Sequence, residues 1–303
     1  MRFRLEVKQY RRPFHTPLQT ARGNWEVRRG IVLRLKDAEG RTGFGEVAPL
    51  EGFGTEGLEE ASQFLDSLGG RWDGGLPAEL PCCQFALRSA QSWMDGTFGR
   101  MDGQLACAAL LPAGDAALTV QQARIAEGYR VFKWKAGTLD APGEMEIVSE
   151  LAAHGTLRVD ANAGLDLQQT RAWLEHLEGI PAVEYLEQPL PMGRWRECIP
   201  LLDEFATAIA LDEDAPDATG WPGLAIIKPA LGRMSAGDIY SSALETSIGK
   251  EAALRMAAGS KRAAGFGVRE LFAEDGLDLH APGPVMTVGA VGQKEMEAVW
   301  ERI

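Results

Sequence analysis

The most constraining feature of this sequence is a series of short apolar runs that alternate with helix-like segments from residue 104 onwards. The runs cover residues 105–111, 131–135, 157–160, 183–187, 208–212, 224–228, 238–244 and, more weakly, 277–280. Strands that alternate with helices predict parallel βαβ units, and about eight units predict a (β/α)8 barrel. Barrels of this kind carry their functional side chains at the carboxyl ends of the strands.

Signals at the helix ends support this pattern. Thr119 predicts a capping box at the start of one helix, which ends near Gly128, and Asp166 predicts the start of another. Only 15 residues lie between Asp212 and Lys228, which end two of the predicted strands, and they contain two prolines and two glycines. We therefore expect this unit of the barrel to lack a full helix.

The first hundred residues have a different pattern. Residues 2–10 alternate between apolar and polar side chains, 28–37 form a second strand-like run, and Gly40 marks a turn into 42–47, which together predict an antiparallel meander. Two helix-like stretches follow, at about 56–68 and 80–95. We expect this part of the chain to form a separate α+β unit.

Composition excludes several classes of function. The chain has 303 residues, of which 31 are basic and 43 acidic, for a net charge of −12. Such a chain is a poor partner for nucleic acid or an anionic membrane, and no apolar run approaches the roughly 18 residues of a membrane span. The N-terminus lacks an apolar signal core, so we expect a cytoplasmic protein.

The four cysteines lack CxxC spacing and are expected to be reduced and buried: Cys82, Cys83, Cys107 and Cys198.

A pair of lysines interrupts the second barrel strand. Side chains alternate along a strand, so Lys133 and Lys135 share one face while Phe132 and Trp134 share the other. In a barrel the aromatic face packs against helices and the lysine face points into the lumen. Burial and a neighbouring ammonium both lower the pKa of a lysine, which favours a general base. The alternative is an exposed edge strand with two solvated lysines.

Each of the next three strands ends in an acid. Asp160, Glu187 and Asp212 occupy the carboxyl ends of neighbouring parallel strands, which brings the carboxylates close together. Converging carboxylates repel unless a cation lies between them, and Mg2+ prefers oxygen ligands. Taken singly, each acid is also explained as a helix cap or a surface residue.

The sixth strand again ends in a lysine, Lys228, roughly across the barrel from the second strand. A lysine pair, three acids and a facing lysine suit proton abstraction next to a carboxylate. The metal stabilises the enediolate charge and a lysine takes the proton.

This constellation resembles the enolase superfamily, in particular its muconate-lactonising subgroup. The resemblance implies a (β/α)7β TIM-like barrel, residues 99–303, with an N-terminal α+β capping domain, residues 1–98, and a C-terminal segment that returns to the cap. It also implies Mg2+, or alternatively Mn2+, on Asp160, Glu187 and Asp212.

Within the subgroup, residues 45–50, 158–162 and 241–249 most resemble the o-succinylbenzoate synthase family. That resemblance implies the dehydration of 2-succinyl-6-hydroxy-2,4-cyclohexadiene-1-carboxylate, a small anion, to 2-succinylbenzoate, as in menaquinone and phylloquinone biosynthesis. It implies that Lys135 removes the α-proton and returns it to the departing hydroxide. Lys228 faces the ring and stabilises the anionic intermediate, and Lys133 tunes Lys135.

A further group of residues is expected to support the metal ligands or to contact substrate. Asn162 shares a strand face with an acid, Glu213 adjoins another, and Phe53 belongs to a loop that is able to close over the substrate. Hydrogen bonds to the succinyl carboxylate are expected from Ser242, Ser247 and Gly249, and Arg158 completes this weaker group.

Two other functions remain open at this point. The same lysines suit an N-acylamino acid racemase, a dipeptide epimerase or a muconate cycloisomerase, in which two bases act on opposite faces. A non-catalytic binding protein on a degenerate barrel is the other alternative, although six charged lumen positions are costly without a use. The sequence does not predict the oligomeric state.

Overall fold

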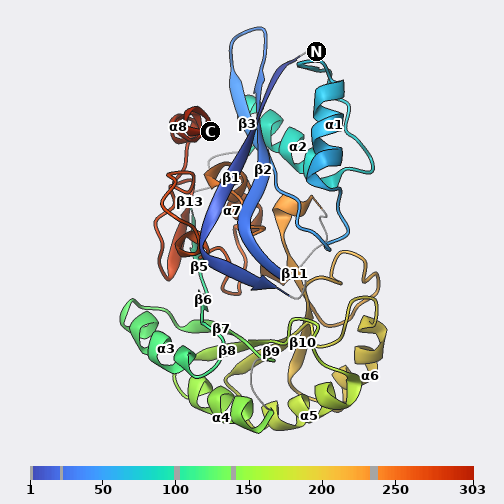
Figure 1. Ribbon diagram of the computed structural model, residues 1–303, viewed down its shortest axis with the longest axis vertical. Coiled ribbons are helices and arrows are strands. Elements are labelled where there is room, and N and C mark those ends of the chain that lie inside the picture. The colour runs from blue at the N-terminus through green and yellow to red at the C-terminus, as the bar shows by residue number, and fades with distance from the viewer. Residues whose placement is uncertain (1–2, 21–22, 99–102, 138–140, 233–237) are drawn as a thin grey trace.

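The structure is a computed structural model that describes residues 3–20, 23–98, 103–137, 141–232 and 238–303. Two main sheets organise these residues (Figure 1). A four-stranded antiparallel sheet, here called the cap sheet, has the order β3-β2-β1-β4, and a seven-stranded parallel sheet has the order β12-β11-β10-β9-β8-β7-β6. A two-stranded ribbon pairs β13 with β5.

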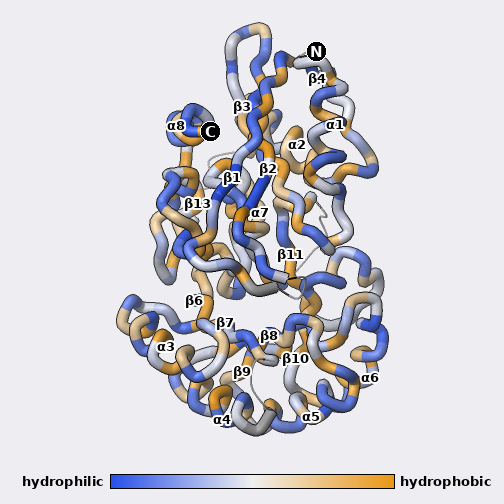
Figure 2. Tube along the Cα trace, in the orientation of Figure 1, coloured by the Kyte–Doolittle hydropathy of each residue, from blue (hydrophilic) through white to orange (hydrophobic). Residues whose placement is uncertain are grey.

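The cap sheet forms from the alternating segments at the N-terminus. Figure 2 shows hydrophobic and hydrophilic residues alternating along its long strands. Gly45 lets helix α2 approach β3 closely, because a Cβ there would lie 1.9 Å from the carbonyl oxygen of Ala86. The elements are β1 (Phe3–Thr20), β2 (Gly23–Lys36), β3 (Thr42–Val47), α1 (Leu58–Ser67), β4 (Arg71–Trp72) and α2 (Pro81–Asp95).

The parallel sheet curls into a barrel, and α3, α4, α5 and α6 cover its outer face in Figure 1. Its strands are β6 (Ala109–Leu110), β7 (Val131–Lys135), β8 (Thr156–Asp160), β9 (Val183–Glu187), β10 (Ala208–Leu211), β11 (Leu224–Ile227) and β12 (Ile239–Tyr240). Its helices are α3 (Ala116–Ala126), α4 (Ala141–Ala152), α5 (Leu167–Leu177), α6 (Ile199–Glu204) and α7 (Ser247–Ala257), with 3-10 turns η1 (Trp195–Cys198) and η2 (Pro229–Leu231).

A very short segment closes the barrel. Ala264 forms a parallel bridge with Cys107, just before β6, and Gly265 forms one with Ser241, just after β12. Backbone hydrogen bonds of 2.7 Å (Ala264 N to Ala106 O) and 2.8 Å (Gly265 N to Tyr240 O) hold this segment in place. The eighth strand position is therefore filled, which gives the predicted (β/α)7β barrel.

The C-terminal residues run back to the cap sheet. They form η3 (Arg269–Leu271), β13 (Val285–Val288), which pairs antiparallel with β5 (Gly103–Ala106), and α8 (Gln293–Arg302). Val299 and Trp300 of α8 pack in one buried cluster with Tyr10, Val32 and Phe44 of the cap sheet. The predicted domain boundary at 98/99 adjoins residues 99–102, which lie outside the described residues, so the division at that point stays a prediction.

The helix and strand predictions had mixed outcomes. Asp166 caps α5 as predicted, since its Oδ1 accepts a 2.8 Å hydrogen bond from Gln169 N. No helix occurs within 213–227, also as predicted. The capping box at Thr119 is wrong, because α3 begins three residues earlier and Thr119 lies inside it. The weak strand at 277–280 is wrong as well, because Ala264 and Gly265 take the eighth strand position and 277–280 form no strand.

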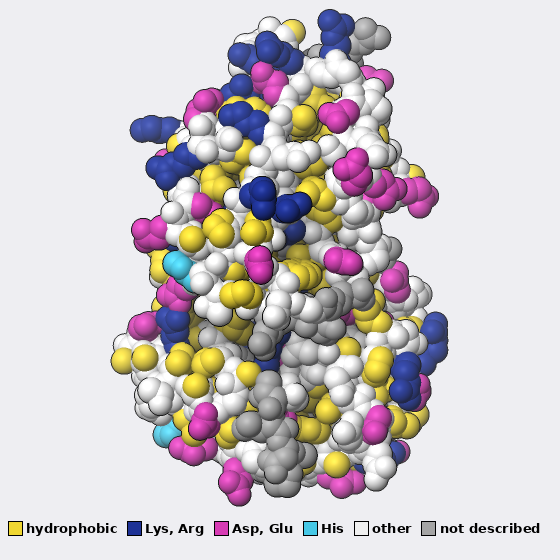
Figure 3. Space-filling view, viewed as in Figure 1, with side chains coloured by type: hydrophobic (Ala, Val, Ile, Leu, Met, Phe, Trp, Pro, Cys, Tyr) yellow, Lys and Arg dark blue, Asp and Glu magenta, His cyan; other side chains and the backbone are white. Residues whose placement is uncertain are grey.

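Other expectations concern the surface and the thiols. The four cysteines are free and buried, as predicted. In the described ranges no helix combines the length and the apolar character that a membrane crossing requires. Figure 3 shows Lys and Arg side chains interspersed with Asp and Glu over the visible face.

Candidate active site

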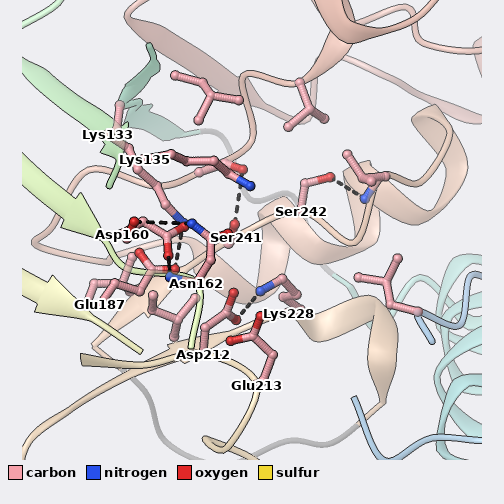
Figure 4. Close-up of a pocket in the computed structure, with 18 of the residues that line it drawn as sticks. Lys133, Lys135, Asp160, Asn162, Glu187, Asp212, Glu213, Lys228, Ser241 and Ser242 are labelled. Carbon is pink, nitrogen blue, oxygen red and sulfur yellow. Dashed lines mark hydrogen bonds and ion pairs between the residues drawn. The ribbon is translucent and has the colours of Figure 1, made fainter. Parts of the chain in front are cut away.

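The largest group of predicted site residues lines one cavity at the carboxyl ends of the barrel strands (Figure 4). The cap side contributes mostly apolar side chains, including Leu18, Trp25, Leu50 and Phe53. The barrel side contributes the charged residues Lys133, Lys135, Arg158, Asp160, Glu187, Asp212, Glu213 and Lys228, together with Asn162 and Ser242. The cavity is therefore apolar toward the cap and charged toward the barrel.

Strand alternation places the lysine pair. Phe132 and Trp134 are completely buried in the core between the sheet and the helices. Lys133 and Lys135 consequently occupy the opposite face of β7 and line the cavity. Strand register then sets Lys135 directly beside Asp160 of β8.

The carboxylates follow along the next strands. Asp160 of β8 is paired in register with Glu187 of β9, and Asp212 immediately follows β10. Lys133 Nζ lies 2.9 Å from Asp160 Oδ2 and 2.6 Å from Glu187 Oε1. Lys228 forms an ion pair with Asp212 (Figure 4). The three predicted acids and all three predicted lysines thus belong to one cluster of charges.

Electrostatics within the cluster differ from the simplest sequence argument. Burial alone would lower the pKa of Lys133, but the charges of Asp160, Glu187 and Asp212 outweigh it and raise the pKa well above its usual value. Lys133 is therefore an ammonium that neutralises acids. The interpretation of the lysine pair considered burial and the neighbouring ammonium but not the acids, and so had the opposite sign for the pKa of this residue.

Glu187 is an acid whose charge this cluster does not fully compensate. Burial and the negative charges of Asp160 and Asp212 raise the pKa of Glu187 to about 8 despite its bond to Lys133. Its Oε2 is buried and has no hydrogen-bond partner. By contrast, burial opposes but does not prevent a lowered pKa for Asp160, because Lys133 and Lys135 are both close.

The donor set fits a hard divalent cation. Three carboxylates converge from neighbouring strand ends, and one buried carboxylate oxygen is unpartnered. As the side chains stand, the described residues include no group of three acids, cysteines or histidines close enough to hold a metal. Lys133 contacts Asp160 Oδ2 and Glu187 Oε1, and Lys228 contacts Asp212 Oδ1, so each carboxylate keeps a second oxygen that a cation would use.

Asn162 and Gln188 shape the backbone at the acidic strand ends. Asn162 N donates a 2.9 Å hydrogen bond to Asp160 Oδ1, and Gln188 Oε1 accepts one of 3.1 Å from Asp212 N. Both residues have a positive φ, of 47° and 36° respectively, which is strained for a residue with a side chain. Gln188 was not predicted as a site residue, although it directly follows Glu187 in the sequence.

Several weaker predictions also fall at the cavity. The ring of Phe53 lies 4.6 Å from Lys228 Nζ, a cation–π contact between cap and barrel. Arg158 donates a 2.7 Å hydrogen bond from Nε to Glu184 and stacks over Tyr185 below the acids. Burial and the charge of Asp212 raise the pKa of Glu213 to about 7.

Of the two serines and one glycine predicted to contact substrate, one lines the cavity and two do not. Ser242 lines the cavity and donates a 3.0 Å hydrogen bond from Oγ to Glu245. Ser247 and Gly249 are not among the lining residues: Ser247 Oγ accepts from Leu279 N, and Gly249 N donates to Glu46 at 2.9 Å. The structure therefore does not bring these two to the substrate cavity, because a buried cap carboxylate and the C-terminal segment already take their polar groups.

Comparison with known proteins agrees with this geometry. Residues 2–94 match the model of the MenC N-terminal domain, and residues 115–222 match the enolase C-terminal domain-like model. The o-succinylbenzoate synthase of Thermosynechococcus vestitus is 33% identical over 99% of this chain and 99% of its own. That of Edwardsiella ictaluri is 28% identical over 97% of this chain and 98% of its own.

Comparison with solved structures agrees with the comparison of sequences. The crystal structure of o-succinylbenzoate synthase from Thermosynechococcus elongatus, complexed with Mg in the active site, has a TM-score of 0.85 and 32% identity, covering 99% of this chain and 100% of that chain. The L-Ala-D/L-Glu epimerase of Bacillus subtilis, at 17% identity, a TM-score of 0.76, and coverage of 94% of this chain and 95% of that chain, shares the fold alone. The chain belongs to the o-succinylbenzoate synthase family of the enolase superfamily.

Proposed function

We propose that this protein dehydrates 2-succinyl-6-hydroxy-2,4-cyclohexadiene-1-carboxylate to 2-succinylbenzoate in the cytoplasm. The observation that carries the proposal is the single cavity in which Lys135 stands beside Asp160, with two further acids and Lys228 around it. A lysine next to converging carboxylates is suited to moving a proton at the carbon next to a substrate carboxylate.

Asp160, Glu187 and Asp212 would hold the Mg2+ or Mn2+ ion. When bound, the ion supplies positive charge that stabilises the enediolate form of the substrate carboxylate. Asn162 and Gln188 hold the backbone next to two of these acids, which fixes where the carboxylate oxygens point. Such support of metal-binding side chains sharpens the geometry of a site.

Lys135 performs both proton transfers. As the free amine it takes the α-proton, and as the resulting ammonium it protonates the departing hydroxide, so that water leaves and the ring becomes aromatic. The proton is used within one turnover, and no oxidant is required. Lys228 faces the ring as an ammonium, and Phe53 contacts the Lys228 ammonium from the cap side. Aromatisation is favourable, so positioning and charge stabilisation suffice.

The charge distribution also supports an anionic substrate. The net charge of −12 disfavours anions at long range, and five acids line this cavity beside three lysines and Arg158. A divalent ion held by three of these acids would make the balance of charge positive where the substrate carboxylate binds. The apolar cap side offers Trp25, Leu50 and Phe53 to the ring and the methylene groups of the succinyl chain.

The test is a turnover assay with purified protein, Mg2+ and the cyclohexadiene carboxylate. We expect 2-succinylbenzoate to accumulate, and chelation with EDTA to stop its formation until Mg2+ is restored. Racemisation of N-succinylamino acids or epimerisation of dipeptides without dehydration would contradict the proposal. Cycloisomerisation of muconate, or binding of all these compounds without turnover, would contradict it equally.

A further inference from the structure

Arg28 of β2 takes no part in the chemistry above, yet it is 5% exposed and makes an unusual set of contacts. Its Nη2 donates hydrogen bonds of 2.6 Å to Ala48 O and 3.0 Å to Ala243 O. Its Nη1 donates 2.7 Å to Pro49 O and 2.8 Å to Arg29 O. One guanidinium thus joins carbonyls from segments nearly two hundred residues apart.

Both joined segments lead directly into the cavity. Residues 48–53 follow β3 and carry Phe53, which contacts Lys228. Residues 241–246 follow β12 and carry Ser242, which lines the barrel side. Arg28 therefore hydrogen-bonds to one segment from each wall of the cavity, the cap wall through Ala48 and Pro49 and the barrel wall through Ala243.

The barrel segment is held by buried acids as well. Glu245 accepts a 2.6 Å hydrogen bond from Ala243 N, and Glu46 accepts bonds of 2.9 Å and 2.5 Å from Thr246 N and Oγ1. Leu244, between these anchors and at the cavity wall, has a φ of 64°. A leucine keeps such a conformation only where surrounding contacts over-determine it, and strained residues of this kind gather at ligand sites.

We propose that Arg28 is a positioning residue for substrate binding, which locks the cap segment 48–53 onto the barrel segment 241–246. This inference rests on the proposed function. A planar guanidinium donates in several fixed directions at once, whereas an ammonium is a compact point charge on a flexible stem. We call this set of hydrogen bonds from Arg28 to residues 48–53 and 241–246 the clasp. It depends on arginine itself, and lysine is not an equivalent replacement.

The experiment compares Arg28→Lys and Arg28→Gln with the unaltered protein in the dehydration assay. We expect KM for the cyclohexadiene carboxylate to rise about tenfold or more while kcat changes by less than about threefold, because the clasped segments hold substrate without touching the reacting atoms. Arg28→Gln removes the charge and keeps an amide donor. It therefore serves as the second variant if Arg28→Lys, which buries a lysine at this position, does not fold.

Arg34→Lys is the matched control. Arg34 lies on the same strand, bonds to Glu6 and Glu297 and stacks over Trp300 of α8, outside the cavity lining. We expect this substitution to lower the melting temperature and to leave KM within about twofold. A merely structural role for Arg28 would give the same result as this control.

Hydrogen–deuterium exchange separates the clasp from the proposed reaction. In Arg28→Gln the amides of 48–53 and of 241–246 should both exchange faster, whereas Arg34→Lys should leave both segments unchanged. A KM within twofold of the unaltered protein, or faster exchange in one segment or neither, overturns the proposal. Absence of dehydration by the unaltered protein would overturn the proposed function. The exchange rates of the two segments would then be the test of whether Arg28 locks them together.

Discussion

Buried charge occurs in two regions of this molecule that use it differently. The active-site cluster combines acids and lysines at the strand ends: Lys133, Lys135, Asp160, Glu187, Asp212 and Lys228. A second set, the α7 ion network, joins α7 to the C-terminal segment: Lys250, Glu251, Arg255, Asp278 and His280. Both sets contain acids that are almost fully buried.

The α7 ion network satisfies its members. Asp278 pairs with Lys250 and with His280 Nδ1, at 3.3 Å for the latter. Glu251 accepts from Arg255 Nε at 2.8 Å, from Gly289 N at 2.8 Å and from His280 Nε2 at 3.1 Å. Within the described part of the chain, none of the network side chains has a buried nitrogen or oxygen without a partner.

The active-site cluster leaves its members incompletely matched. Glu187 Oε2 has no partner, and the pKa of Glu187 is raised to about 8 by burial and by neighbouring acids. In the network, burial raises the pKa of Asp278, but the charges and hydrogen bonds of Lys250 and His280 together outweigh burial, and the pKa of that acid falls. Paired buried charges hold elements together, whereas an excess of carboxylates creates a site that a further cation would complete.

Among the substitutions that distinguish the active-site cluster from the α7 ion network, Lys135→Ala is expected to have the largest effect, which is a loss of kcat. Loss of the group that moves the proton should reduce kcat by about 10^4-fold, with little change in melting temperature. Lys261→Ala, an exposed lysine outside the cavity, is the control and should retain full activity. Turnover within tenfold of the unaltered protein would remove Lys135 from its assigned role.

Glu187→Gln tests whether the cluster sacrifices stability for metal binding. We expect activity to fall by about 10^3-fold and the stabilisation by added Mg2+ to disappear. Without Mg2+, the melting temperature should stay the same or rise, because one buried carboxylate no longer faces Asp160 and Asp212. Glu184→Gln, on the same strand, should keep the Mg2+ response; a preserved response in Glu187→Gln would contradict the ligand assignment.

Lys250→Met tests the opposite property of the α7 ion network. It leaves Asp278 buried without its cation, so the free energy of unfolding should fall by about 3–5 kcal/mol in urea denaturation. The activity of the folded fraction should stay within about twofold. A stability loss below about 1 kcal/mol would show that pairing in this network does not hold the C-terminal segment.

The smallest expected effect is a pH dependence of stability through His280. Burial lowers the pKa of this histidine, but hydrogen bonds to Asp278 and Glu251 outweigh burial and raise it above 6.5, with Lys250 opposing them. Its stabilising contribution is complete below pH 6.5 and disappears as pH rises through the folded-state pKa. Melting temperature should therefore fall more from pH 6 to pH 9 in the unaltered protein than in His280→Gln, and equal falls would contradict this.

The charged strand ends were predictable because each is a local exception to a strong pattern. A lysine or acid that ends an apolar strand is visible in a short window of sequence, and the barrel then brings such residues together. Lys133, Lys135, Asp160, Glu187, Asp212 and Lys228 all line the cavity for this reason.

Features that depend on distant parts of the chain were not predictable in this way. Glu46 takes the amide of Gly249 from 203 positions away, which removes a donor that looked available to substrate. Arg28 matches no local motif, and its contacts appear only once cap and barrel are assembled. The pKa of Lys133 likewise depends on three acids from three other strands.

A crystal of this protein soaked in Mn2+ tests the central claim most directly, through anomalous scattering. We predict a strong peak about 2.1–2.2 Å from one oxygen each of Asp160, Glu187 and Asp212. A peak that omits these carboxylates, or no peak while Lys133 keeps its bonds to Asp160 and Glu187, would contradict the metal site from which the proposed chemistry follows.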